Sequence, residues 1–383
     1  MVMFTVQVVI TTKISSDHKK AKFLLCLFYY NNNNTDGTIK MNKTRIILLT
    51  LLSAVSTVAC AEKKPQYKCS VSSPKWAKEF NKVYQLDEFR VYYSDLESST
   101  QNLPQTADIN NNKIPDYVEN IAIQAMNSRD MFKLAGFRSP LDSPRYQNSA
   151  ESIAIFLQKT GGNGVAFERA ARYPNLSINS KDMPCSISIV ISNNLEGFPG
   201  SWATVTHELF HLYQYGYAQF KNSWYLESLA NWADRAMKID ITNNTKRLPP
   251  LPQTRTEINQ DIFGKAYTHI WRRLFLINDS DILEIPEDML KRRYVGGSKV
   301  FLDNEWRGTH FVLTFMQNLE KESNRISAEK KWEPYHWKEK DQRSKEWDPL
   351  ILQLIQKQLK QPKYDQKETR FMRNISIQNL KSE

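Results

Sequence analysis

The feature that most constrains this chain is the pentapeptide His207-Glu208-Leu209-Phe210-His211. On an α-helix, residues four apart lie one turn above each other on one face, so both imidazoles can reach a single ion. Glu208 then lies to the side, where its carboxylate can hold a water molecule bound to that ion. The spacing therefore predicts a helix that carries two metal ligands, and zinc is the usual ion for this arrangement.

The residues around the pentapeptide support a helix independently of the motif. At 100° per residue, Val205, Leu209 and Leu212 gather opposite the two histidines. The segment thus reads as an amphipathic helix with its ligands on one face and its core contacts on the other.

A catalytic zinc site usually takes three protein ligands and leaves a fourth place to water, so a third ligand is needed. Glu227 follows His211 by sixteen residues, inside the segment WYLESLANW at 224–232. This segment predicts a second helix with an apolar back and an opposite face that carries Glu227, Asn231 and Asp234.

These two helices resemble those of the gluzincin metallopeptidases, the thermolysin-like and aminopeptidase-N-like group, whose third ligand lies in a segment similar to W-x-x-E-x-x-A-x-W/Y. The resemblance is close over about thirty residues and looser from about Phe89 onward, where the chain is similar to secreted bacterial metalloproteases. It implies that His207, His211 and Glu227 bind zinc, that Glu208 is the general base, and that the substrate is a peptide or protein. It also implies an α+β, zincin-like fold in which a small mixed sheet packs on the HExxH helix and a mostly helical C-terminal part follows.

The sequence departs from the gluzincin pattern in two places. The gap between His211 and Glu227 is a few residues shorter than in thermolysin-like enzymes, and Ser228 stands where many aminopeptidases have Gly. The chain also lacks the Gly-x-Met-x-Asn segment that binds the substrate amine in the exopeptidases. These differences favour an endopeptidase and leave open a catalytically inactive, zinc-bearing binding or cell-surface module of the same fold.

Gluzincins commonly add a Tyr or His that stabilises the oxyanion of the tetrahedral intermediate. The candidates that the resemblance suggests are Tyr267 and His269 in KAYTHIW, and His310 in RGTHFVLTFMQNL. Each of them is also an ordinary residue for the core or the surface of a helical region, so the donor stays open at this point.

The N-terminal residues have the pattern of an export signal. Residues 1–40 have no continuing periodicity, and Met41 then opens a positive segment, an apolar run from Ile46 to Val58, and a small-residue cleavage site at Ala59-Cys60-Ala61. We therefore expect residues 1–40 to be a non-native extension, residues 41–61 to be a signal peptide, and the protein to be exported. An N-terminal membrane anchor, or a lipid anchor through Cys60, remains the alternative.

The remaining chain divides into a catalytic subdomain at 62–247, a helical subdomain at 248–322 that completes the site, and a charged helical tail at 323–383. Of the net charge of +11, residues 1–61 contribute +5, with seven Lys or Arg against two Asp. The remaining excess is mild and no nucleic-acid-binding motif accompanies it, so we expect no nucleic-acid partner. We expect no stable membrane span in the mature chain.

Two cysteines remain once a signal peptide is removed, Cys69 and Cys185. In an oxidising compartment an even pair favours a disulfide, and two unpaired buried thiols are the alternative. Neither cysteine has the spacing to join the zinc site.

A second candidate metal site lies at 108–119. Side-chain or backbone oxygens stand at positions 1, 3, 5, 7, 9 and 12 of a twelve-residue loop, as in EF-hand calcium loops: Asp108, Asn110, Asn112, Ile114, Asp116 and Glu119. Position 6, which usually needs Gly for a positive φ, is Lys113, so we expect the turn there to be strained or differently shaped. A calcium ion that stabilises the fold and an ordinary asparagine-rich surface loop both stay open.

Strands are expected at 86–94, 152–158 and 185–192, from alternation and β-branched content. A helix is expected from Pro115 to about Ala135, and an amphipathic one at 350–359. The glycines at 161, 162 and 164 predict a turn that brings the chain close to the site. The resemblance implies that the strand before the zinc helix is an edge strand that pairs with substrate, which makes Asn193 and Asn194 candidates for substrate hydrogen bonds.

Overall fold

The computed structural model describes Cys69, Leu176, Trp271, Leu274 and the ranges 72–173, 185–200, 202–238, 250–263, 281–359 and 367–375. These residues all belong to the compact unit that runs from Lys63 to Glu383. The sequence predictions for residues 1–61 fall outside the described residues.

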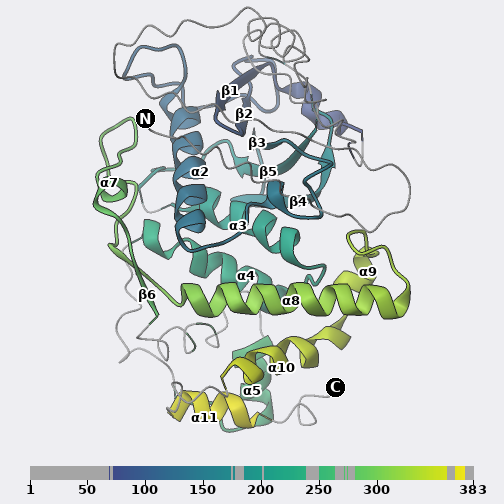
Figure 1. The fold of residues 1–383 in the computed structure, drawn as a ribbon. Coiled ribbons are helices and arrows are strands. Elements are labelled where there is room, and N and C mark those ends of the chain that lie inside the picture. Colours follow the sequence, from purple (N-terminus) through teal and green to yellow (C-terminus); the bar gives the residue numbers. More distant parts are fainter. Residues whose placement is uncertain are drawn as a thin grey trace, which may run out of the picture. The chain divides into compact units, whose positions relative to one another are not determined.

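A five-stranded mixed sheet lies toward one end of this unit, with most of the helices on one side of it (Figure 1). Its order is β1-β2-β3-β5-β4, with β1 at Lys82–Leu86, β2 at Phe89–Tyr93, β3 at Ser152–Gln158, β5 at Ser186–Ser192 and β4 at Gly164–Ala171. Strands β2, β3 and β5 are parallel, whereas β1 and β4 run antiparallel to their neighbours at the two ends of the order.

Both faces of the three central strands are covered, so almost every residue of these strands is buried, including Arg90 and the serines of β5. On one face, Val91, Ile155 and Ile189 join the large core that the helices complete. On the other face, Tyr92, Phe156 and Val190 pack beneath the short 3-10 helix η1 at Lys75–Glu79. Burial on two sides fixes the register of the sheet, because a slip by one residue would exchange the faces of every side chain.

Three helices pack on the first face of the sheet or next to it. They are α2 at Asp116–Leu134, α3 at Thr204–Tyr217 and α4 at Ser223–Ala233. Helix α3 lies against β4, β5, α2 and α4. The residues opposite its histidines, Val205, Leu209 and Leu212, are fully buried, which confirms the predicted core face.

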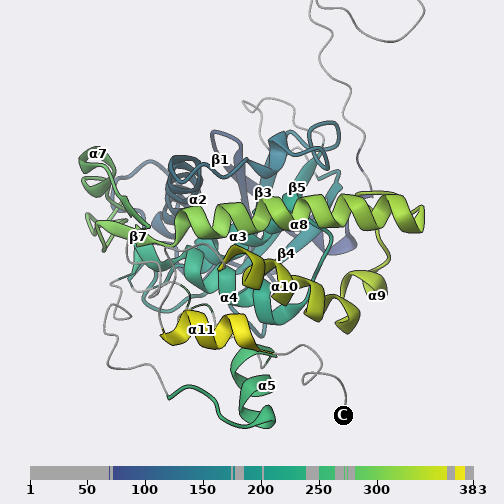
Figure 2. The same cartoon turned by 60° about the horizontal axis from the view of Figure 1, so that its bottom comes forward.

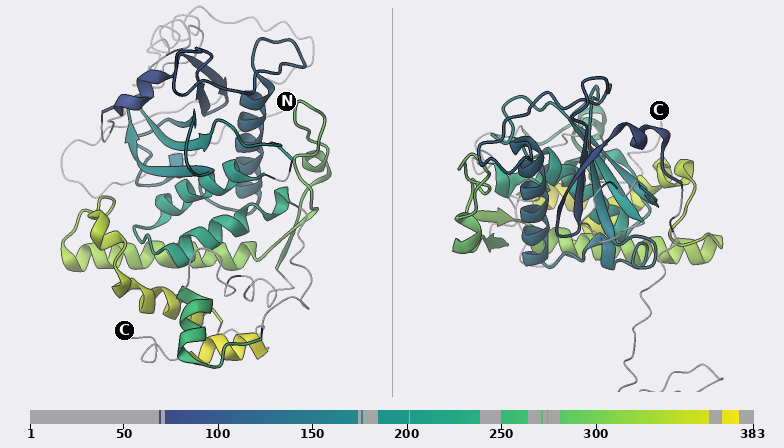
Figure 3. Two further views of the ribbon diagram at one scale, coloured as in Figure 1. Left: turned by 180° about the vertical axis from the view of Figure 1, so that it is seen from behind. Right: turned by 90° about the horizontal axis from the view of Figure 1, so that it is seen from above.

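The C-terminal part is mostly helical, as expected, with one small addition. Its long helix α8, Thr309–Lys330, lies on the side of α3 and α4 that faces away from the sheet (Figures 2 and 3). The other elements are α5 at Arg255–Phe263, β6 at Ile282–Glu284, α7 at Glu287–Leu290, β7 at Glu305–Arg307, α9 at Glu339–Gln342, α10 at Asp348–Gln358 and α11 at Lys367–Asn374. Strands β6 and β7 pair in an antiparallel two-stranded sheet that the sequence did not predict.

The C-terminal tail packs on the rest of the unit. Trp337 and Trp347 both contact Phe220, which lies between α3 and α4. Asp348, the first residue of α10, accepts hydrogen bonds from Asn222 Nδ2 and Trp224 Nε1 at the start of α4. The tail thus helps to fix the helix that carries Glu227.

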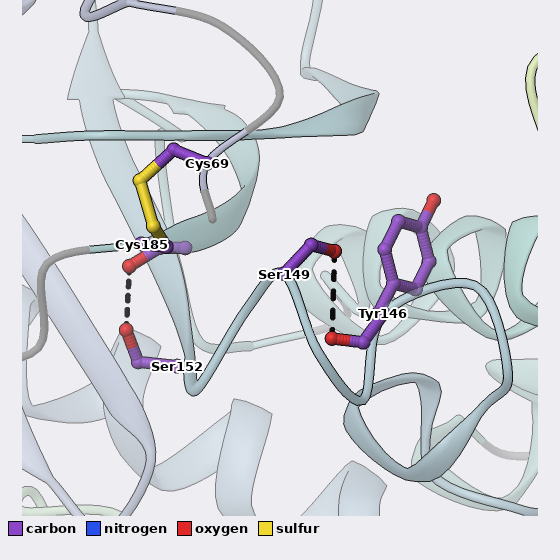
Figure 4. The surroundings of a disulfide bond; sticks show 6 residues. Cys69, Tyr146, Ser149, Ser152 and Cys185 are labelled. Atoms are coloured by element: carbon purple, nitrogen blue, oxygen red, sulfur yellow. Dashed lines mark hydrogen bonds between the residues drawn. A yellow bond between two sulfur atoms is a disulfide. The ribbon is translucent and has the colours of Figure 1, made fainter. Parts of the chain in front are cut away.

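Cys69 and Cys185 form a disulfide, as the sequence predicted (Figure 4). The bond ties the N-terminal segment to the residue that precedes β5. Close by, the hydroxyl groups of Ser152 and Ser186 form a hydrogen bond of 2.5 Å. A cross-link across 116 residues removes many conformations from the unfolded chain.

Two strand predictions need correction. The expected strand at 86–94 is interrupted, because Leu86 ends β1 and Asp87 takes a φ of +50° in the turn to β2. The strand before α3, β5, is not an edge strand, because β4 pairs with its outer side. None of the helices in the described ranges is both long and apolar enough to cross a membrane.

Candidate metal centre

Helices α3 and α4 bring two imidazoles and one carboxylate together. His207 Nε2 lies 3.3 Å from Glu227 Oε2, and His211 Nε2 lies 3.6 Å from the same oxygen. Among the described residues, these three form the group of His, Cys, Asp and Glu side chains that could hold a metal ion together. Their donor atoms all lie within 4.8 Å of one another. Residues twenty positions apart thus meet as the sequence predicted.

Two of the three donor separations fit one small cation. A tetrahedral zinc ion with bonds of about 2.0–2.1 Å places its donors about 3.3 Å from one another. The separations of 3.3 and 3.6 Å from Glu227 Oε2 are close to that value, and all three donor atoms lie within 4.8 Å of one another. The Glu227 side chain is 38% exposed, so the cluster is open to solvent on one side and leaves room for a fourth donor such as water.

The charges of Glu227 and His211 shift each other's pKa. Hydrogen bonds from His207 and His211 hold the pKa of Glu227 well below its usual range. Burial alone would lower the pKa of His211. The hydrogen bond with Glu227 and the charges of Glu208 and Glu227 outweigh burial and raise that pKa. Glu227 is therefore an anion under ordinary conditions, ready to bind a positive charge.

Glu208 lies beside the cluster in a nearly dry environment. It is 7% exposed, and burial raises the pKa of its carboxyl, although His211 and His207 partly offset this effect. A carboxylate with a raised pKa is a better proton acceptor than an exposed one, which is the property that a general base needs.

The first residue of β4 closes over Glu208. A Cβ atom at Gly164 would lie 2.6 Å from Glu208 Cγ and 2.8 Å from its Oε1. Only glycine leaves the carboxyl group its observed place. The sequence predicted that the glycine segment approaches the site, but it did not single out Gly164.

Two further residues of α3 contact His211. Gln214 Oε1 lies 2.7 Å from His211 Nδ1, and the ring of Tyr215 stacks on the His211 ring at 6.2 Å and 14°. Burial, and secondarily the charge of Glu208, raise the pKa of Tyr215 well above its ordinary value, so its phenol stays neutral. Sequence reasoning missed both, although positions three and four after His211 on a helix are where such contacts are expected.

A buried ion cluster supports the end of α3. Arg145 Nη2 and Lys221 Nζ contact the Glu168 carboxylate at 2.6 and 3.1 Å, and Lys221 also reaches Glu339 of α9. Arg145 donates in addition to the Tyr215 carbonyl. This cluster joins β4, the residues after α3 and the C-terminal tail behind the metal cluster.

The predicted oxyanion donors are not brought to the cluster by any described contact. His310 is exposed at the first turn of α8, where its backbone N–H donates to Asp281 Oδ1. Tyr267 and His269 lie outside the described residues. The donor therefore remains a prediction.

Asn193 and Asn194 have structural partners instead of a free edge. Asn193 Nδ2 donates to the Asn102 carbonyl and is buried, and Asn194 Oδ1 accepts from Gln105. Because β4 and not β5 is the edge strand, the prediction that these residues bind substrate loses its structural basis.

The loop at 108–119 keeps a positive φ at its sixth position, although that residue is not glycine. Lys113 has a φ of +71°, and Asp108 accepts hydrogen bonds from the backbone N–H groups of Asn112 and Lys113. Glu119 accepts from the side-chain amides of Asn110 and Asn112. Asp116 binds the Ile109 N–H, and Ile114 donates its own N–H to Asn112. The loop is folded as a closed turn, and calcium binding there stays a prediction.

Comparisons of the chain with protein-family models, with curated proteins and with solved structures find no match in any of the three. The function is therefore inferred from the geometry of the cluster.

Proposed function

We propose that this protein is a zinc-dependent metallopeptidase with a zincin-like fold that cleaves peptide bonds within chains. The observation that carries the proposal is the convergence of His207, His211 and Glu227, whose donor atoms lie within 4.8 Å of one another, with Glu227 Oε2 at 3.3 and 3.6 Å from the two imidazole nitrogens. Two imidazoles and one carboxylate with an open side are the donor set of catalytic rather than structural zinc sites.

The chemistry divides between the ion and the chain. A zinc ion would supply a Lewis acid that polarises a carbonyl oxygen and acidifies water. Glu208, held dry beside the cluster, takes one proton from the attacking water as its oxygen bonds to the carbonyl carbon. It then passes that proton to the departing amine as the C–N bond breaks, so the base is regenerated.

The position of β4 favours an extended peptide as substrate. β4 lies at one end of the sheet order and starts at Gly164, directly against Glu208. Its outer backbone groups can pair with an added strand, which would carry a peptide carbonyl past the base. Val165 and Phe167 lie on the face of β4 opposite to Gly164, and their exposed fractions are 45% and 39%.

Export of the protein is part of the proposal. The Cys69–Cys185 disulfide supports it, because such bonds persist mainly in oxidising compartments. Residues 41–61, which have the pattern of a signal peptide, also favour export. Mass spectrometry of the product released by the native host would test it, and a chain that retains residues 41–61 in the cytosol would contradict it.

The test of the proposed function combines metal analysis with hydrolysis of unfolded casein. Wild type should contain one zinc per chain, cleave internal bonds, and lose activity on chelation. Glu208→Gln should keep the zinc and lose turnover. Glu329→Gln, which changes a 60% exposed glutamate on α8, is the matched control and should behave as wild type. Zinc without hydrolysis in any variant would favour a binding module instead.

A further inference from the structure

Gln214 is placed to act on two of the proposed ligands at once. It is 2% exposed, follows His211 by three residues on α3, and uses both ends of its amide. Oε1 lies 2.7 Å from His211 Nδ1, and Nε2 donates to the Leu226 carbonyl at 3.0 Å. Leu226 immediately precedes Glu227 on α4.

The hydrogen bonds fix which way the amide points. A backbone carbonyl can only accept, so the group that faces Leu226 must be the NH₂ of Gln214. Oε1 then faces His211 Nδ1, and because Oε1 can only accept, Nδ1 must carry the proton. In neutral His211 the lone pair is therefore on Nε2, the atom that points at Glu227 Oε2.

The second hydrogen bond, from Gln214 Nε2 to the Leu226 carbonyl, joins the same amide to α4. Glu227 is held on a helix whose backbone is tied, one residue earlier, to the amide that orients His211. Since Gln214 is buried, solvent water cannot easily take over either bond. One side chain thus sets the tautomer and ring angle of one ligand and the distance to another.

We propose that Gln214 is a positioning residue of the metal centre, which presents His211 Nε2 to the ion and holds the Glu227 helix in register. This inference rests on the proposed zinc site and deepens it. Outer partners of ligating histidines typically change metal affinity by about 10- to 100-fold when they are removed.

The experiment compares zinc affinity, measured by competition with a chromophoric chelator, in three variants of the full chain. Gln214→Met keeps the length and loses both bonds. Gln214→Glu keeps an acceptor for His211 Nδ1–H and loses the donor to Leu226. Gln358→Met is the control, because Gln358 is also a buried glutamine that donates to a backbone carbonyl, that of Phe311, within the C-terminal helices.

We expect Gln214→Met to bind zinc about 10- to 100-fold more weakly than wild type, and Gln214→Glu to recover most of the loss. The visible absorption of the cobalt-substituted protein should change in the Met variant and return toward wild type in the Glu variant. Gln358→Met should lower only the free energy of unfolding.

A merely structural role for Gln214 gives a different result. Zinc affinity of Gln214→Met equal to that of Gln358→Met and wild type would overturn the inference and leave the proposed function intact. If Gln214→Met does not fold, Gln214→Ala, which also loses both bonds, decides: zinc affinity at least tenfold below that of wild type supports the inference, and affinity equal to wild type overturns it. A wild-type protein that takes up no zinc would overturn the proposed function and this inference together.

Discussion

The close approach of Gly164 to Glu208 allows a sharp prediction. Replacing Gly164 by Ala would put a methyl group 2.6 Å from Glu208 Cγ, whereas ordinary contact begins at 3.4 Å. The atoms in the way belong to a side chain rather than to the backbone, so the Glu208 carboxyl group should move aside by about 1 Å and the strand should stay in place. A misplacement of about 1 Å in catalytic geometry can cost about 100-fold in rate, or roughly 2.7 kcal/mol of activation free energy.

The assay is kcat/KM on a fluorogenic unfolded substrate, with thermal unfolding and zinc content measured on the same samples. Gly164→Ala should lose about 100-fold in kcat/KM and keep its zinc and its unfolding temperature. Gly162→Ala in the same segment is the control, because its added Cβ would meet only Thr160 Oγ1, at 3.9 Å. Activity of Gly164→Ala within a few-fold of Gly162→Ala would refute the placement of the base.

Three further predictions concern stability. Burial alone would raise the pKa of Glu168, but its ion pairs with Arg145 and Lys221 outweigh burial and lower that pKa. The ion pairs therefore stabilise the fold above the pKa of glutamate in the unfolded chain, about 4.3. This stabilisation is lost as the pH falls through the lower pKa of Glu168 in the folded protein. Glu168→Gln should therefore cost about 3–5 kcal/mol in unfolding free energy at pH 7 and little at acid pH, and an equal loss at both would contradict the ion-pair account. Cys69→Ser should lower the unfolding free energy by up to about 4 kcal/mol in denaturant titrations, and a variant as stable as wild type would count against the disulfide. If the 108–119 loop binds calcium, the ion should raise the unfolding temperature of wild type and not of Glu119→Gln; no rise in wild type would leave an ordinary surface loop.

The sequence was most informative where a pattern depends on local geometry. The helical spacing of His207 and His211 and the apolar stripe opposite them predicted α3, and β3 has the bounds that its β-branched residues suggested. The meeting with Glu227 followed from the resemblance in the second helix. These features depend on a few neighbouring residues and therefore survive without knowledge of the tertiary fold.

The features that were missed depend on how separate elements pack against one another. Strand β4, GVAFERAA, has the composition of a helix as much as of a strand, and pairing with β5 makes it extended. That pairing also makes β4 rather than β5 the edge strand, so the edge-strand argument for Asn193 and Asn194 no longer holds. The role of Gln214 needs the position of Leu226 on another helix, and no local pattern encodes it.

Zinc K-edge X-ray absorption on the purified wild-type protein tests the central claim most directly. The account predicts a four-coordinate ion with two imidazole nitrogens, at least one carboxylate oxygen and no sulfur, and loss of one imidazole in His211→Ala. A spectrum with sulfur ligands, with fewer than two imidazoles, or unchanged in His211→Ala would contradict it.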